Sequence, residues 1–165
     1  MNINNDKNKC CCFTGHRPYK LGISEYKAKE LISKAVDIMI EKGYTTFISG
    51  MAQGVDMWAA EVVLSKRESN TDIFLIAASP YKNIENKWGE KDKNLYNHII
   101  NNADKVEYLC DHYVPYCFQL RNNWMVNHST MVIAAYNNED GGTKNTIKYA
   151  IQNGVSVYNI LNENF

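Results

Sequence analysis

Six short apolar runs alternate with helical patterns along this chain of 165 residues, and this alternation is the strongest constraint on its fold. The expected strands are residues 9–14, 44–49, 73–78, 105–110, 131–136 and 155–161, with Ser79 and Pro80 ending the third. The expected helices cover 24–42, 54–67, 86–101, 117–128 and 141–154. Continuous apolar strands joined by helical crossovers form parallel sheets that are buried on both faces. The sequence therefore predicts an α/β fold, a Rossmann-like doubly wound and mainly parallel sheet with helices on both faces.

Length and charge limit the kind of protein this is. A chain of this length fits one domain, residues 1–165, and its 18 basic and 18 acidic residues give zero net charge. Proteins that bind bulk nucleic acid usually need a basic excess, so that class is disfavoured, whereas a small anionic ligand is not. No apolar run reaches the roughly 20 residues of a membrane span, and residues 1–9 are polar, so we expect a cytoplasmic protein without membrane contact.

Five cysteines occur, three of them consecutive at Cys10, Cys11 and Cys12, with Cys110 and Cys117 far downstream. Neighbouring strand residues point to opposite faces, so a consecutive triplet does not build a disulfide framework. No pair has the spacing of a zinc site. We expect reduced thiols packed in a core, no metal and no cofactor.

Three strand-to-helix turns are the places where chemistry is expected, because ligands of doubly wound sheets bind outside the carboxyl ends of the strands. The turns are Thr14-Gly15-His16-Arg17-Pro18, Ser49-Gly50-Met51-Ala52-Gln53-Gly54-Val55-Asp56 and Gly141-Gly142-Thr143. All three leave the same edge of a parallel sheet, so we expect them to converge on one ligand.

Glycine turns at helix starts favour a phosphate ligand, because the backbone comes close and free N–H groups face the anion. Arg17 and His16 are expected to neutralise its charge. Glycines also serve ordinary tight turns, so each turn alone is weak evidence. The predicted ligand contacts in these turns are Thr14, Gly15, His16, Arg17, Ser49, Gly50, Met51, Gln53, Gly54, Asp56, Gly141, Gly142 and Thr143.

The helix expected after the fourth strand carries Arg121, Asn122 and Trp124, which we add to the predicted ligand contacts. Arg121 and Trp124 share a helix face at i and i+3, and such a face is suited to stack and hydrogen-bond a base or ribose. The alternative is a Trp124 packed in the core and an Arg121 held in a structural ion pair. Trp58 is expected in the core or in a dimer interface rather than under a base.

Four segments together resemble the YpsA-like family of the SLOG superfamily (Smf/DprA–LOG). They are TGHRP (14–18), SGMAQGVDMWAAE (49–61), RNNWMV (121–126) and GGTKNTIKYA (141–150), and the similarity covers about residues 10–160. The resemblance implies a Rossmann-like fold that binds nucleotides or nucleotide-derived ligands, often as a dimer. We therefore expect a homo-oligomer.

Two departures from the family pattern stand out. Close relatives tend to read RNRxMVD, whereas this chain has Asn123 and Asn127 at the second arginine and the aspartate. Cytokinin-activating hydrolases of the superfamily carry GGxGTxxE, and here Thr146 stands where that glutamate would be. A hydroxyl is no general base at neutral pH, so that hydrolysis is not carried over.

Three classes of function remain. The first is a sensor, carrier or sponge for a nucleotide-derived phosphorylated molecule; other SLOG domains bind ADP-ribose-type signals in antiphage defence, and a role in antiphage or anti-defence signalling fits. The second is a hydrolase that cleaves an N-glycosidic or phosphoester bond, with Asp56 and Glu61 as candidate catalytic groups. Asp56 equally suits the helix dipole, and Glu61 equally suits a charged partner for Arg17. The third is DNA handling or a protein-interaction role.

Overall fold

The computed structural model describes residues 6–162. Its strands are β1 (Cys10–Gly15), β2 (Thr46–Ser49), β3 (Phe74–Tyr81), β4 (Lys105–Cys110), β5 (Met131–Ala135) and β6 (Ser156–Asn159). Its helices are α1 (Pro18–Leu21), α2 (Glu25–Glu41), α3 (Val55–Arg67), α4 (Glu90–Asn102), α5 (Cys117–Asn127) and α6 (Gly142–Gln152), with short 3₁₀ turns η1 (Lys7–Lys9) and η2 (Ile84–Lys87). Within this range no helix has both the length and the apolar character that crossing a membrane requires.

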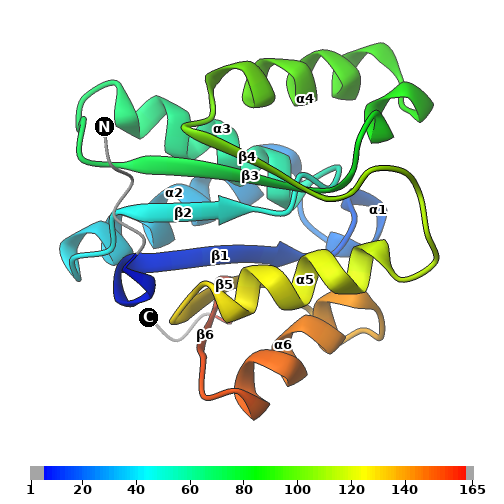
Figure 1. Cartoon of the computed structure of the whole chain (residues 1–165). Helices are drawn as coiled ribbons and strands as arrows, with labels where there is room; N and C mark the ends of the chain where they lie inside the picture. The colour runs from blue at the N-terminus through cyan, green and yellow to red at the C-terminus, as the bar shows by residue number, and fades with distance from the viewer. Residues whose placement is uncertain (1–5, 163–165) are drawn as a thin grey trace.

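The strands form one parallel sheet in the order β4-β3-β2-β1-β5-β6, which confirms the predicted Rossmann-like α/β fold (Figure 1). The chain leaves β1 toward β2 on one side and returns at β5 on the other. Neighbouring strands whose connections diverge in this way open a crevice at their carboxyl ends. The fold therefore places the crevice after β1 and β5.

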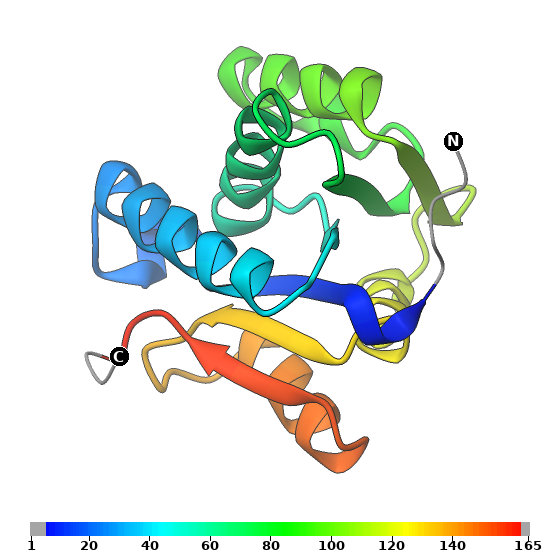
Figure 2. The same ribbon diagram turned by 90° about the vertical axis from the view of Figure 1, so that its left-hand side faces the viewer.

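Alternation along β1 explains the run of cysteines. Cys11 and Phe13 belong to the core under α2, α3 and α4, whereas Cys12 belongs to the core under α5 and α6. Figure 2 shows α2 and α6 on opposite sides of the sheet. All five cysteines are free, and burial raises the pKa of the Cys12 thiol to about 12. The three cysteines are therefore buried, unpaired thiols, and Cys11 and Cys12 pack in the two cores on opposite faces of the sheet, as expected.

Local signals fix the ends of α2. The Ser24 side chain accepts a hydrogen bond from the backbone N–H of Lys27 at 3.2 Å, which caps the first turn. Gly43 follows the helix with φ of +90°, a left-handed conformation that glycine adopts without a steric penalty. Both ends agree with the sequence pattern.

Two features differ from expectation. The third strand does not end at Ser79 and Pro80 but continues to Tyr81. Beyond Ala77, the one strand that pairs with β3 in the described sheet is β4. Pro80 lacks a backbone N–H, and no second strand lies there to accept a hydrogen bond from it. The short helix α1 was also not predicted. It begins at Pro18, the preferred first position, and ends at Gly22 with φ of +77°.

Phe13→Ala is expected to destabilise the fold by about 3–5 kcal/mol, because it leaves a cavity in a close-packed core. Phe13 and Phe47 are fully buried and stack with ring centroids 6.1 Å apart. Urea unfolding followed by circular dichroism measures the change. Tyr26→Ala is the control, since Tyr26 is 81% exposed and its loss should change the free energy of unfolding by less than about 0.5 kcal/mol. Equal effects of the two substitutions would contradict the close packing of the Phe13 ring.

Candidate functional site

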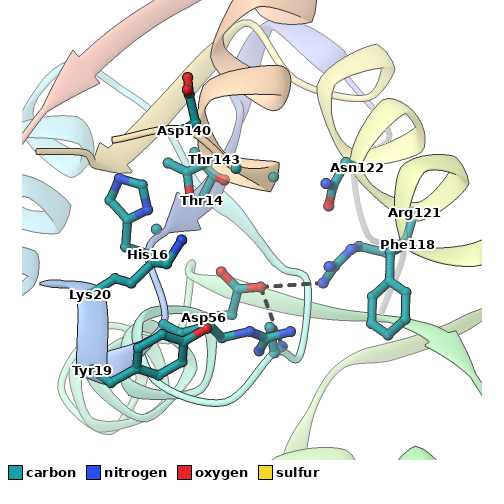
Figure 3. A pocket seen from close by; sticks show the side chains of 15 residues that line it. Thr14, His16, Tyr19, Lys20, Asp56, Phe118, Arg121, Asn122, Asp140 and Thr143 are labelled. Carbon is teal, nitrogen blue, oxygen red and sulfur yellow. Dashed lines mark hydrogen bonds and ion pairs between the residues drawn. The ribbon is translucent and has the colours of Figure 1, made fainter. Parts of the chain in front are cut away.

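A cavity of about 260 Å³ opens at the crevice after β1 and β5 (Figure 3). The turns after these strands supply most of its wall, and the first turns of α5 close one side. Its lining residues are Thr14, Gly15, His16, Arg17, Tyr19, Lys20, Ala52, Asp56, Phe118, Arg121, Asn122, Asp140, Gly141, Gly142 and Thr143.

Most of the predicted contacts meet at this cavity. Those that line it are Thr14, Gly15, His16, Arg17, Asp56, Arg121, Asn122, Gly141, Gly142 and Thr143. Those that do not are Ser49, Gly50, Met51, Gln53, Gly54 and Trp124. The first and third turns therefore form the wall, and the second turn lies mainly behind it.

A buried ion pair forms the floor. Arg121 Nη1 lies 3.3 Å from Asp56 Oδ2, with side-chain exposures of only 5% and 8%. The same Nη1 donates to the carbonyl oxygen of Gly50, and Asp56 Oδ2 accepts the N–H of Ala52 at 3.3 Å. Burial raises the pKa of the Asp56 carboxyl, and the positive charges of Arg121 and Arg17 oppose that shift. A structural ion pair was one of the two roles that the sequence left open for Arg121, the other being a contact with the ligand.

The ion pair leaves no room for a side chain at Gly50. A Cβ at position 50 would lie 2.2 Å from Arg121 Nη1 and 2.6 Å from Asp56 Oδ2. Ser49 supports the same turn, because its hydroxyl donates to the carbonyl oxygen of Asp56 at 2.8 Å and accepts the N–H of Met51 at 3.2 Å. The second turn therefore holds the floor in place.

The start of α6 lines the cavity with Gly141, Gly142 and Thr143. Gly141 precedes the helix with φ of +146°, and no side chain caps the first turn. The Thr146 hydroxyl donates to the carbonyl oxygen of Gly142 at 2.9 Å, so it serves the helix itself. Uncapped N–H groups and the helix dipole give this wall a partial positive charge.

Among the lining residues that the structure describes, the cationic side chains without an ion pair are Arg17 and Lys20. Arg17 makes one long hydrogen bond, from Nη1 to the carbonyl oxygen of Gln53 at 3.4 Å. Within residues 6–162, the Lys20 ammonium has no ion pair or hydrogen bond. His16 is 4% exposed, and burial lowers its pKa, so the imidazole is neutral at pH 7 and supplies no charge. His16 lines the cavity as predicted, and desolvation leaves the ligand's charge to other side chains in the structure without a ligand.

The suggested contact between Glu61 and Arg17 does not form. Glu61 Oε2 lies 2.7 Å from Lys29 Nζ, between α3 and α2, and Glu61 does not line the cavity. Trp124 also lies elsewhere, where it stacks on His128 with ring centroids 4.1 Å apart. Trp58 is 7% exposed in the core under α2, α3 and α4, one of the two places expected for it.

Sequence reasoning missed five lining residues, namely Tyr19, Lys20, Ala52, Phe118 and Asp140. Tyr19 and Lys20 lie on α1, which the proline at its start and the glycine at its end could have revealed. Asp140 pairs with Lys144 at 2.5 Å and is mostly exposed. Phe118 had no signal beyond its place at the start of an expected helix. In the described range, no three His, Cys, Asp or Glu side chains gather as a metal site would need.

Comparison with known proteins gives matches over nearly the whole chain. The model of the YspA SLOG family matches residues 11–161. A UPF0398 protein of Bacillus cereus (strain B4264) is 29% identical over 152 residues, which cover 87% of this chain and 81% of that protein.

Two solved structures of DNA processing protein A (DprA) are similar in fold. The protein from Streptococcus pneumoniae gives a TM-score of 0.65 at 18% identity, over 98% of this chain and 54% of that one. The protein from Helicobacter pylori, whose structure was reported for its single-stranded DNA binding mode, gives a TM-score of 0.67 at 20% identity. The match covers 93% of this chain and 65% of that one. This chain thus spans about half to two thirds of those chains, and the likeness concerns the fold alone.

Arg121→Met is expected to destabilise the protein by about 3–5 kcal/mol, because it leaves the Asp56 carboxyl buried without its cation. The double variant Asp56→Leu/Arg121→Met should lose clearly less, since neither charge is then left alone. Urea unfolding of both variants and the wild type measures this. A double variant as unstable as Arg121→Met, or a single variant as stable as the wild type, would contradict a buried pair.

The buried His16 is expected to make stability fall as pH falls from about 7 to 5. The folded state holds the His16 pKa below its ordinary value of about 6.5, so the unfolded state binds the proton more readily. Acid therefore favours unfolding, by at most about 1.4 kcal/mol per pH unit for one group. Unfolding curves across this range should show a smaller slope for His16→Gln. If His16→Gln shows the same dependence of stability on pH as the wild type, His16 is not the source of that dependence.

Proposed function

Because this chain belongs to the YspA SLOG family, we propose that its cavity binds a nucleotide-derived phosphorylated small molecule without changing it chemically. The protein then acts as a sensor, carrier or sponge, and ADP-ribose-type signals are the ligands that the family resemblance suggests. The observation that carries this proposal is the meeting of the uncapped start of α6 with two free cations at one cavity.

The charge balance of the cavity favours a phosphomonoester end on the ligand. Asp56 neutralises Arg121, and Asp140 is neutralised by Lys144. Arg17 and Lys20 remain as two positive charges, and His16 adds none. A phosphomonoester carries about −1.5 to −2 at pH 7, which these two side chains and the N–H groups of α6 balance.

The size of the cavity favours a small ligand or one end of a larger one. Sites for drug-sized ligands measure roughly 300–1,000 Å³, and this cavity holds about 260 Å³. A ribose phosphate or a mononucleotide suits this volume. The remainder of an ADP-ribose derivative would extend out of the opening.

The placement of carboxylates supports binding over hydrolysis. An acid or base must reach the bond that breaks. Asp56 is held by Arg121 and by the N–H of Ala52, and Glu61 is bound to Lys29 outside the cavity. Asp140, the other acidic residue of the lining, is paired with Lys144. No carboxyl group among the lining residues is thus left without a partner.

Charge also weighs against handling of long nucleic acid. The chain has zero net charge, and each neutralised phosphate of a strand would need a cation. Two free cations in one small cavity match a single phosphorylated ligand better.

Arg17→Ala is expected to weaken binding of adenosine 5′-monophosphate by about 1.5–3 kcal/mol, the value of a hydrogen bond to a charged group. Isothermal titration calorimetry measures the affinity. Lys27→Ala is the matched control, because Lys27 pairs with Glu30 on the exposed side of α2. Chromatography of the same mixtures should show no free base or phosphate after prolonged incubation.

Equal affinity of Arg17→Ala and the wild type, with both folded, would remove Arg17 from the site. Release of base or phosphate over many turnovers would instead favour the hydrolase. Mass spectrometry of small molecules set free from the heat-denatured protein tests the ligand class directly.

A further inference from the structure

Two aromatic side chains line the cavity, Tyr19 from α1 and Phe118 from α5. Among the exposed large hydrophobic residues of the described range, Tyr19 belongs to α1, and Tyr113, Tyr116 and Leu120 lie in or just before α5. These two segments also supply Lys20 and Phe118 to the lining. Exposed aromatic groups beside a polar cavity are typical of surfaces that bind a ligand with an apolar, planar part.

Phe118 is the best-held ring of this group. Its ring meets that of Tyr81 edge to face, with centroids 6.2 Å apart at 88°. Tyr81 is 7% exposed and meets Tyr113 in the same manner at 5.7 Å. The adjacent residue, Cys117, is fully buried and anchors the start of α5 in the core. Neighbours thus fix the Phe118 ring while part of its surface lines the cavity.

Tyr19 lies on the other side of the opening. In Figure 3 the rings of Tyr19 and Phe118 stand on opposite sides of the Asp56 carboxylate. Tyr19 is 82% exposed, so few neighbours hold its ring. Ordering such a side chain on a ligand costs conformational entropy, which a fixed ring avoids. Phe118 is therefore the better stacking surface of the two.

We propose that Phe118 is the stacking platform for a nucleobase, which makes the ligand a nucleoside phosphate rather than a phosphorylated sugar. This inference rests on the proposed function, because the phosphate end is the one held by α6, Arg17 and Lys20. The remaining lining is polar or small, apart from Tyr19, so Phe118 is the firm apolar surface that a planar ring meets. It takes the role that the sequence suggested for Trp124, from the other end of α5.

The test compares two probes that differ only by the base, adenosine 5′-monophosphate and ribose 5-phosphate. Phe118→Leu keeps apolar volume but removes the aromatic face. Stacking of a base on an aromatic side chain corresponds to about a 5- to 150-fold difference in affinity. Calorimetry of Phe118→Leu should show that loss for adenosine 5′-monophosphate and no change for ribose 5-phosphate.

Two further variants make the result specific. Phe118→Tyr keeps the ring and should bind both probes as the wild type does. Tyr116→Leu removes an exposed ring from the same segment, 63% exposed and outside the lining, and should also leave both affinities unchanged.

The possible outcomes separate the two proposals. If the wild type binds both probes equally and Phe118→Leu changes neither affinity, the platform is wrong while phosphate binding stands. If Phe118→Leu weakens both probes alike, Phe118 shapes the cavity and does not stack a base, which also overturns the inference. If the wild type binds neither probe, the proposed function fails for this class of ligand, and the platform fails with it.

Discussion

The ion pair between Asp56 and Arg121 is the interaction on which the cavity depends. Asp56 stands in the first turn of α3 and Arg121 in the middle of α5, helices that cover opposite faces of the sheet. Their side chains meet beyond the end of β2, where Arg121 also bonds the carbonyl oxygen of Gly50. Two buried charges are costly unless each satisfies the other. The pair therefore links the two helix layers beyond the carboxyl end of β2, where the sheet does not separate them.

This pair also decides which charges a ligand meets. Since Asp56 already neutralises Arg121, the lining keeps its excess positive charge at Arg17 and Lys20, on the side of β1 and α1. The uncapped start of α6 lies against the same space. An anion is thus favoured at the crevice between β1 and β5, where the connections of the sheet diverge. On the side of Phe118, the described lining consists of Phe118, Asn122 and the paired Arg121, which suits a neutral ring.

The sequence predicted the strands, their parallel arrangement and the turns at the cavity, because those features follow from local apolar patterns and glycines. Positions on α5 were harder to predict. Arg121 and Trp124 share a helix face, but three residues correspond to about 4.5 Å along the axis. The helix runs away from the cavity, so Arg121 reaches it and Trp124 stacks on His128 instead. Glu61 was misjudged for a related reason, since its pairing with Lys29 depends on how α2 and α3 pack. The burial of His16 against Tyr136 likewise depends on loop packing that local sequence patterns do not show.

The same geometry explains what the departures from the family pattern on α5 mean. Asn123 accepts a hydrogen bond from Gln119 at 2.7 Å, and Asn127 accepts one from the Tyr149 hydroxyl at 3.1 Å. Neither residue lines the cavity, whereas Arg121 and Asn122 do. The RNRxMVD pattern thus divides into a first part that reaches the cavity and a later part that serves the helix surface and the contact between α5 and α6. This chain keeps the first part and changes the second, at two positions that lie outside the lining.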